Sequence, residues 1–285
     1  MNDRSETSIR SAFQSLKCLL LSPLLLTFTA LMVSGTGVLA QTSASPSSQA
    51  SSGLRTTDQV VDQVCDFLKA QQSFTFDMDV SYDDVLESGA KVQYSAYQKV
   101  WVQKPNNLRS DYVGDERTTS FYYNGKFFTL YAPNLDYYST KAAPDTLDAV
   151  IDQVEEKHGV TIPMSNLVVS DPCADMKSNV QRTMFIGVDM VNRIPMYHIL
   201  LLGDDRDFQI WVTQDKQPLL GKAIITYKTL PGSPQYTVFL SNWNFNPKIP
   251  ADTFTFTPPE GANQIAFLPA EGFLPTTGNS NVQQK

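Results

Sequence analysis

The spacing of apolar residues along the chain predicts a leading helix followed by strands. Between residues 57 and 70, apolar side chains recur every three or four positions, and Thr56 or Thr57 can cap the helix that this spacing indicates. From residue 74 to residue 82 the period changes to two, so that large apolar side chains alternate with polar ones. This alternation is typical of a strand with one buried face.

Further alternating segments, separated by turn residues, continue through most of the chain. The predicted strands fall into a first set at 92–103, 108–113, 118–123, 126–131 and 135–140, and a second set at 181–191, 195–202, 206–213, 219–227 and 235–245. Asn124-Gly125, between two of these strands, is a strong signal for a type I′ hairpin. Long strands joined by hairpins predict an α+β fold that is mainly antiparallel β, with a strongly curved sheet or partly open barrel.

A helical segment separates the two sets of strands. The stretch 144–159 begins with a proline, has apolar residues at helical spacing and ends at Gly159. Two shorter helical pieces are expected at 163–171 and 172–177. We expect these helices and the leading helix to cover one face of the sheet, because an apolar sheet face has to be buried against another layer.

The first 40 residues have the composition of an export signal. Basic residues up to Lys17 precede an apolar run from 18 to 33, and small residues at Val38 and Ala40 fit a signal-peptidase site. We therefore predict a signal peptide at 1–40, cleavage after Ala40 and a location in the periplasm. The alternative is an uncleaved membrane anchor, for which the apolar run is at the short end.

The chain after the cleavage site is expected to divide into three parts. Residues 41–56 are rich in serine, alanine and glutamine, which is typical of a disordered linker. Residues 57–268 contain the periodic segments and are predicted to form a single domain. Residues 269–285 are polar and are expected to form a flexible tail.

The charge of the chain limits its partners. The formal net charge is −7, and 18% of residues are charged. Nucleic-acid binding requires a basic surface, and so does electrostatic docking on anionic lipid. We therefore expect no nucleic-acid partner.

Two cysteines, Cys65 and Cys173, remain after the predicted cleavage. In an oxidising compartment they form a disulfide if the fold brings their Cα atoms within about 7 Å. The alternative is a pair of buried free thiols, and the sequence does not choose between the two.

Residues that usually carry catalysis are few. The two histidines, His158 and His198, lack the spacing of a helical metal pair, and the chain has neither a nucleophile elbow nor a phosphate-binding loop. The acidic cluster from Asp204 to Asp207 lacks the ordered ligand spacing of a calcium loop and is expected at a hairpin tip. We predict no catalytic residue, no metal site and no cofactor.

The apolar faces of the strands are the strongest candidate for a binding surface. They are predicted to line a cavity or groove between the curved sheet and the helices. The candidate lining residues are Phe76, Met78, Val80, Val100, Val102, Phe208, Ile210 and Val212. The alternative is that the helices fill this space and the residues form an ordinary core.

Several segments resemble a known family. They are KVWVQKP at 99–105, LRSDY at 108–112, DFQIWV at 207–212, IITYK at 224–228, LSNWNFNP at 240–247, IPADTFTF at 249–256 and PPEGA at 258–262. These segments are similar to the DUF2092 family of predicted periplasmic proteins, which looks like a branch of the lipoprotein-carrier superfamily of LolA, LolB and RseB. The resemblance spans about Thr57 to Leu268.

The resemblance implies an unclosed β-barrel with helices as a lid over an apolar cavity. Carriers of this kind hold acyl chains in the cavity, and they tend to have an arginine before the proline that ends the second strand. This chain has Lys104 there, and we expect Lys104 and Arg109 at the lid or rim of the cavity.

Three functions are compared on this basis. The first is a periplasmic, non-enzymatic protein that binds a lipid or other apolar small molecule. The second is an envelope sensor or protein-interaction module of the RseB type with a filled core. The third is an enzyme, which would need a polar cleft with His198 within about 3 Å of a carboxylate.

Overall fold

The computed structural model describes residues 56–158, 162 and 164–266. The predicted export signal, its cleavage site, most of the predicted linker and the predicted tail lie outside these residues. Among the helices that are described, none is long and apolar enough to cross a membrane.

The described strands form one twelve-stranded sheet in the order β12-β6-β5-β4-β3-β2-β1-β11-β10-β9-β8-β7. Strand β1 (Ser73–Val85) pairs with β2 (Lys91–Gln103) on one side and with β11 (Gln235–Asn244) on the other. The β1–β11 pairing therefore joins the two sets of strands. The other strands are β3 (Asn107–Gly114), β4 (Thr118–Tyr123), β5 (Phe127–Ala132), β6 (Tyr137–Ala142), β7 (Val180–Val191), β8 (Ile194–Gly203), β9 (Arg206–Thr213), β10 (Leu220–Tyr227) and β12 (Asn263–Gln264).

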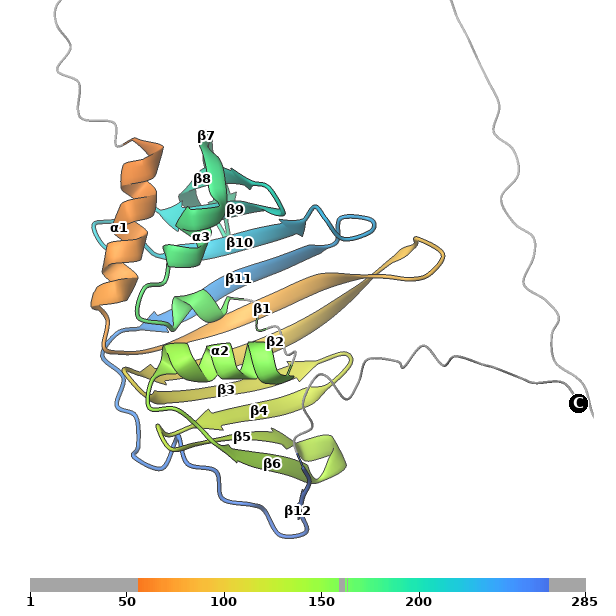
Figure 1. Cartoon of the computed structure of the whole chain (residues 1–285). Coiled ribbons are helices and arrows are strands. Elements are labelled where there is room, and N and C mark those ends of the chain that lie inside the picture. Colours follow the sequence, from red (N-terminus) through yellow and green to blue (C-terminus); the bar gives the residue numbers. More distant parts are fainter. Residues whose placement is uncertain (1–55, 159–161, 163, 267–285) are drawn as a thin grey trace, which may run out of the picture. The chain divides into compact units, whose positions relative to one another are not determined.

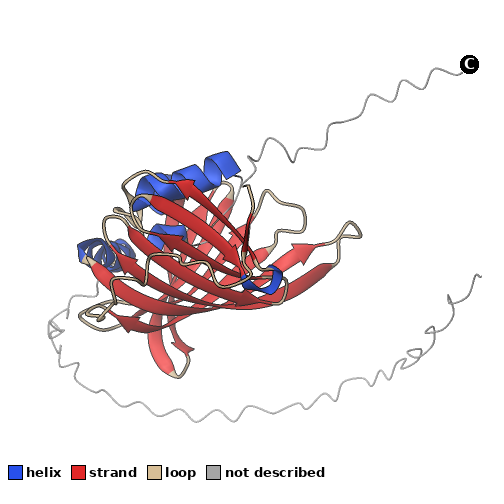
Figure 2. Ribbon diagram, turned by 90° about the horizontal axis from the view of Figure 1, so that it is seen from below, coloured by secondary structure: helices blue, strands red, loops and turns tan. Residues whose placement is uncertain are grey.

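The sheet is antiparallel except for the short β12–β6 pairing, and it does not close into a barrel. Its outer strands, β7 and β12, are not paired with each other. Seen from below, the sheet curves and the helices lie on one side of it (Figure 2). The prediction of an unclosed, mainly antiparallel sheet with covering helices is confirmed.

The leading helix has the predicted bounds. Helix α1 spans Thr57–Ala70 and begins with a capping box, in which the Thr56 side chain accepts from the Gln59 backbone and the Gln59 side chain accepts from the Thr56 backbone. Its buried residues are Val60, Val61, Val64, Cys65 and Leu68. They form the apolar stripe by which an amphipathic helix packs on a core.

The middle helical segment covers the face of the sheet beside β1 to β3 (Figure 1). Helix α2 spans Leu147–His158, so it starts three residues after the predicted start at residue 144. Thr146 caps the helix by accepting a hydrogen bond from the Ala149 backbone at 3.2 Å. Leu147, Val150, Ile151 and Val154 are buried. A 3₁₀ turn, η2 (Ser165–Leu167), and α3 (Ala174–Asn179) follow, and another 3₁₀ turn, η1 (Pro133–Leu135), precedes β6.

Cys65 and Cys173 form a disulfide, with their Cα atoms 5.7 Å apart. The bond joins α1 to the residue that precedes α3. Two ion pairs lie beside it, Lys69–Asp171 at 2.9 Å and Lys177–Asp62 at 2.6 Å, and both are exposed to solvent. Exposed pairs of this kind contribute little to stability because solvent screens them, so the disulfide is the stronger link between the two helices.

Two features of the sheet differ from the prediction. Strand β1 continues to Val85, three residues beyond the predicted end of the alternating segment at residue 82. Strand β12 was not predicted, because two residues are too short to show a period. It is held by backbone hydrogen bonds from Asn263 to Asp136 at 2.7 Å and from Ile265 to Tyr138 at 2.8 Å.

Candidate functional site

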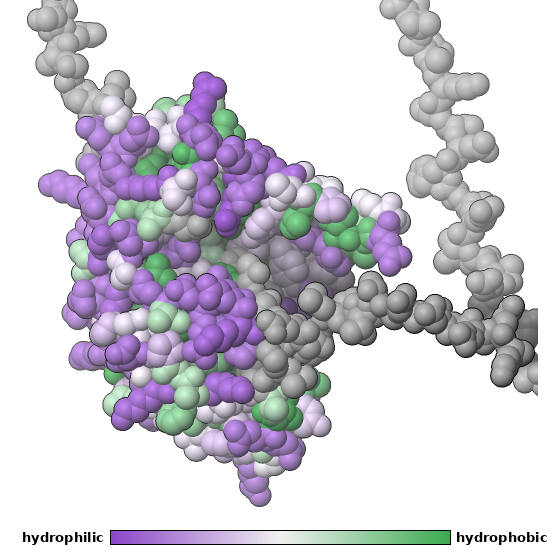
Figure 3. Space-filling view, viewed as in Figure 1, coloured by the Kyte–Doolittle hydropathy of each residue, from purple (hydrophilic) through white to green (hydrophobic). Residues whose placement is uncertain are grey.

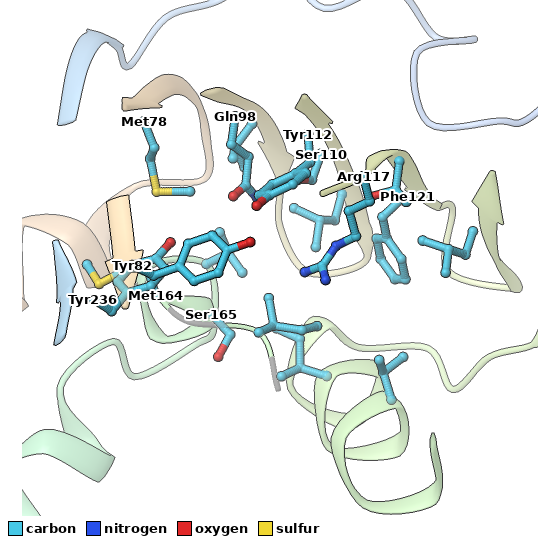
Figure 4. A pocket seen from close by; sticks show the side chains of 18 of the residues that line it. Met78, Tyr82, Gln98, Ser110, Tyr112, Arg117, Phe121, Met164, Ser165 and Tyr236 are labelled. Atoms are coloured by element: carbon cyan, nitrogen blue, oxygen red, sulfur yellow. The ribbon is translucent and has the colours of Figure 1, made fainter. Parts of the chain in front are cut away.

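A cavity of about 380 Å³ lies between the sheet and the segment that contains α2 and η2. The sheet contributes residues from β1 to β5 and from the β10–β11 hairpin. These include Phe76, Met78, Tyr82, Gln98, Val100, Leu108, Ser110, Tyr112, Phe121, Phe128, Leu130, Tyr227 and Tyr236. The opposite wall consists of Ile151, Val154, Ile162, Met164, Ser165 and Val168. Figure 4 shows residues of both walls pointing toward the space between them.

Much of the cavity lining is apolar because the apolar face of β1 and β2 lies opposite the apolar face of α2. Phe76 and Met78 are two positions apart in β1, and Val100 faces Phe76 across the β1–β2 ladder. Ile151 and Val154 are three positions apart in α2, so both point toward the sheet. The outer surface over α2 is hydrophilic (Figure 3), as expected for a helix that buries one face.

Polar residues also line the cavity. Asp83 lines it, accepts from the Gln235 backbone at 3.0 Å and pairs with Lys91 at 3.3 Å. The Tyr82 hydroxyl donates to the Glu116 carboxylate. These residues come from the end of β1, the start of β2, the β3–β4 turn and the start of β11. Further polar groups in the lining are those of Gln98, Ser110, Thr119 and Ser165.

Two phenols along this cavity stay neutral over the physiological range. Burial raises the pKa of Tyr236 well above its usual value. Burial, together with the hydrogen bond to Glu116, also raises the pKa of Tyr82. Both residues therefore contribute uncharged side chains to the lining of the cavity.

Arg117 is the cationic side chain among the lining residues. It lies in the turn between β3 and β4, and its guanidinium carbon is 5.2 Å from the Tyr112 ring centroid. Figure 4 shows the guanidinium directed into the cavity. Sequence reasoning missed this residue, because a turn has no hydrophobic period.

The other five residues that were predicted to line the cavity lie in the packed core instead. Val80, Val102, Ile210 and Val212 are buried there, and Phe208 is partly buried against the core. Phe76, Met78 and Val100 are the predicted residues that do line the cavity. Strand alternation indicates which face a residue occupies, but it does not indicate how far along that face the covering helices fill the space.

Lys104 was predicted to lie at the lid or rim of the cavity. Lys104 does not line the cavity: its Nζ is buried without a hydrogen-bond partner and lies 5.9 Å from the Phe74 ring centroid. Burial lowers the pKa of Lys104, although Asp148 and Asp171 act in the opposite direction. Lys104 is therefore a half-buried residue whose ammonium group is inaccessible to solvent, and a role for it at the lid stays a prediction.

The expectation for Arg109 is corrected by strand alternation. Leu108 and Ser110 line the cavity, so Arg109 between them points to the other face of β3. There its guanidinium lies 5.1 Å from the Trp101 ring and 4.9 Å from the Tyr122 ring, and it pairs with Asp111 at 2.8 Å.

His198 lies as close to a carboxylate as a general base requires, but it does not line either of the cavities described here. Its Nδ1 lies 2.8 Å from the Asp189 carboxylate, and its Nε2 lies 3.1 Å from the Gln209 side-chain oxygen. The ring stacks on Trp211 at 4.1 Å and is largely buried on the sheet. His198 lines neither the cavity described above nor a second one, of about 330 Å³, between β4 to β6 and residues 254–258. Among the described residues, no cluster of ligating side chains is suited to a metal ion.

Comparisons with solved structures find proteins of low sequence identity. An uncharacterized conserved protein from Thermus thermophilus is 6% identical, with a TM-score of 0.43, 73% of this chain covered and 98% of that chain. LprF from Mycobacterium bovis is 13% identical, with a TM-score of 0.42 and coverages of 73% and 97%. A LolA superfamily protein from Nitrosomonas europaea is 13% identical, with a TM-score of 0.33 and coverages of 70% and 97%.

No curated protein matches the chain. A family model described as "Predicted periplasmic protein (DUF2092)" matches residues 57–268. The matched range begins with α1 and includes every described strand and helix. The protein therefore belongs to the DUF2092 family of predicted periplasmic proteins.

Proposed function

We propose that this protein binds a lipid or other apolar small molecule in the cavity between the sheet and α2, in the periplasm and without catalysing a reaction. The observation that carries the proposal is the cavity itself, with apolar side chains from β1 and β2 on one wall and from α2 on the other. A cavity of this composition takes an apolar ligand because burial removes apolar surface of both partners from water.

The size of the cavity supports one small ligand. Its volume of about 380 Å³ lies at the lower end of the range of about 300–1,000 Å³ that is usual for small-molecule sites. An acyl chain gains about 0.8 kcal/mol for each methylene that it buries. A few buried methylenes therefore suffice for measurable binding.

Filling the cavity tests the proposal. We expect Val100→Trp to weaken the binding of a fluorescent fatty acid at least tenfold, because the indole occupies the space of the ligand. Val113→Trp is the matched control, since Val113 is 55% exposed, lies on β3 and does not line the cavity. Circular dichroism and thermal unfolding establish that both variants fold. Equal binding by wild type and Val100→Trp would contradict the proposal.

The periplasmic location rests on the predicted export signal, and the Cys65–Cys173 disulfide supports it because such bonds persist in oxidising compartments. The intact mass of protein extracted from the periplasm tests the cleavage site. A chain that begins at Gln41 is expected. A mass that includes residues 1–40 would favour the uncleaved anchor.

A second candidate function, binding of an extended peptide from an envelope protein, is favoured by β7. This outer strand exposes Phe185, Ile186, Val188 and Met190, and it is paired with β8 alone among the described strands. An apolar edge strand can accept one further strand by backbone hydrogen bonds. A protein partner that cross-links to wild type but not to a Val188→Lys variant would support this function.

A further inference from the structure

We propose that the ligand is a single-chain amphiphile with a carboxylate headgroup, and that Arg117 binds this carboxylate. The inference rests on the proposed function and adds the class of ligand. It follows from a mostly apolar cavity lining that includes one cationic side chain, Arg117, and several hydrogen-bonding groups.

The position of Arg117 is defined by its neighbours. The turn that carries it is closed by a hydrogen bond from the Gly114 backbone to the Arg117 carbonyl at 2.9 Å. The guanidinium lies against the Tyr112 ring, with 5.2 Å between the Cζ atom and the ring centroid. Stacking of this kind orients a guanidinium while leaving its N–H donors free for a ligand.

The acidic residues near Arg117 are engaged elsewhere. Glu116 accepts from the Tyr82 hydroxyl, and Asp115 accepts from the Ser95 backbone at 2.7 Å. Asp83, the acidic residue that lines the cavity, pairs with Lys91. Among the described residues no carboxylate forms an ion pair with Arg117, so its charge is available to a ligand.

The chemistry of the headgroup follows from this arrangement. A guanidinium binds a carboxylate through two parallel N–H···O hydrogen bonds, which are stronger than bonds between neutral groups. The Tyr112 hydroxyl lies on the same side of the cavity (Figure 4). Phe76 and Ile151, from opposite walls of the same cavity, contribute apolar side chains against which an alkyl chain can pack.

The test compares three probes at pH 8 with delipidated protein: dodecanoate, dodecanol and acetate. Wild type is expected to bind dodecanoate about tenfold more tightly than dodecanol, because only the former pairs with Arg117. Acetate is expected to bind much more weakly than either, because it lacks the chain. Titration calorimetry measures all three affinities.

Substitution assigns the difference to one residue. Arg117→Gln is expected to lose about tenfold in dodecanoate affinity and to keep its affinity for dodecanol. Arg182→Gln is the matched control, because Arg182 is exposed on β7 and does not line the cavity. Unchanged dodecanoate binding by Arg117→Gln would overturn this inference while the proposed function stands. Failure of wild type to bind either long-chain probe would overturn both.

Discussion

Phe76 in β1 is paired with Val100 in β2, and both side chains line the cavity although they are almost fully buried. The preceding pair on the same face, Phe74 and Val102, is fully buried and does not line the cavity. Within this one pair of strands, the apolar face of the sheet therefore contributes side chains both to the packed core and to the cavity lining. One part of this face is packed in the core, and another part, opposite α2, lines the cavity.

The disulfide is expected to stabilise the fold substantially. It joins residues 108 positions apart, and in the chain-entropy account a loop of about 100 residues corresponds to about 4–5 kcal/mol. We expect a Cys65→Ala/Cys173→Ala variant to lose several kcal/mol in the free energy of unfolding. Urea denaturation measures this loss, and reduced wild type should show a similar one. An unchanged urea midpoint would contradict the prediction.

Lys104 is expected to reduce stability. Its buried ammonium has no hydrogen-bond partner, and burial lowers its pKa, so the folded protein bears the cost of a desolvated charge. We expect Lys104→Met to raise the free energy of unfolding by about 1 kcal/mol at pH 7. The gain should shrink as the pH rises toward the usual lysine pKa, because the wild-type side chain then loses its proton.

Ligand affinity should not change in Lys104→Met, because Lys104 does not line the cavity. The exposed Lys141 on β6 provides the control substitution, Lys141→Met. If Lys104→Met weakened ligand binding while Lys141→Met did not, Lys104 would act at the lid after all.

Tyr123 is expected to make stability fall at alkaline pH. Burial, with a contribution from Asp145, raises its pKa to about 12, and its hydroxyl donates to the Pro144 carbonyl at 2.7 Å. Above about pH 10 the unfolded phenol loses its proton while the folded one keeps it, so stability decreases as the pH rises from about 10 to 12. Tyr123→Phe should show a shallower decrease in its urea midpoint. Identical slopes in the two proteins would contradict this assignment.

Local signals in the sequence predicted much of the fold. The bounds of α1 follow from its capping box and apolar stripe, and the strands of both sets follow from their period of two. The β1–β11 pairing could not be read in this way, because it joins residues that are far apart in the chain. It depends on the whole sheet rather than on any one segment.

The candidate site was harder to predict than the fold. Phe76, Met78 and Val100 were found because they alternate along strands, but the same pattern also selected core residues such as Val212. Arg117 has no periodic pattern around it, because it lies in the turn between β3 and β4, and the fold alone places it among the lining residues.

The most direct test of ligand binding is native mass spectrometry of the wild-type protein purified from periplasm under mild conditions. We predict a species heavier than the mature chain by the mass of one small amphiphile, which organic extraction removes and a long-chain fatty acid restores. A single species at the mass of the chain alone, with no uptake of any long-chain probe, would contradict the account.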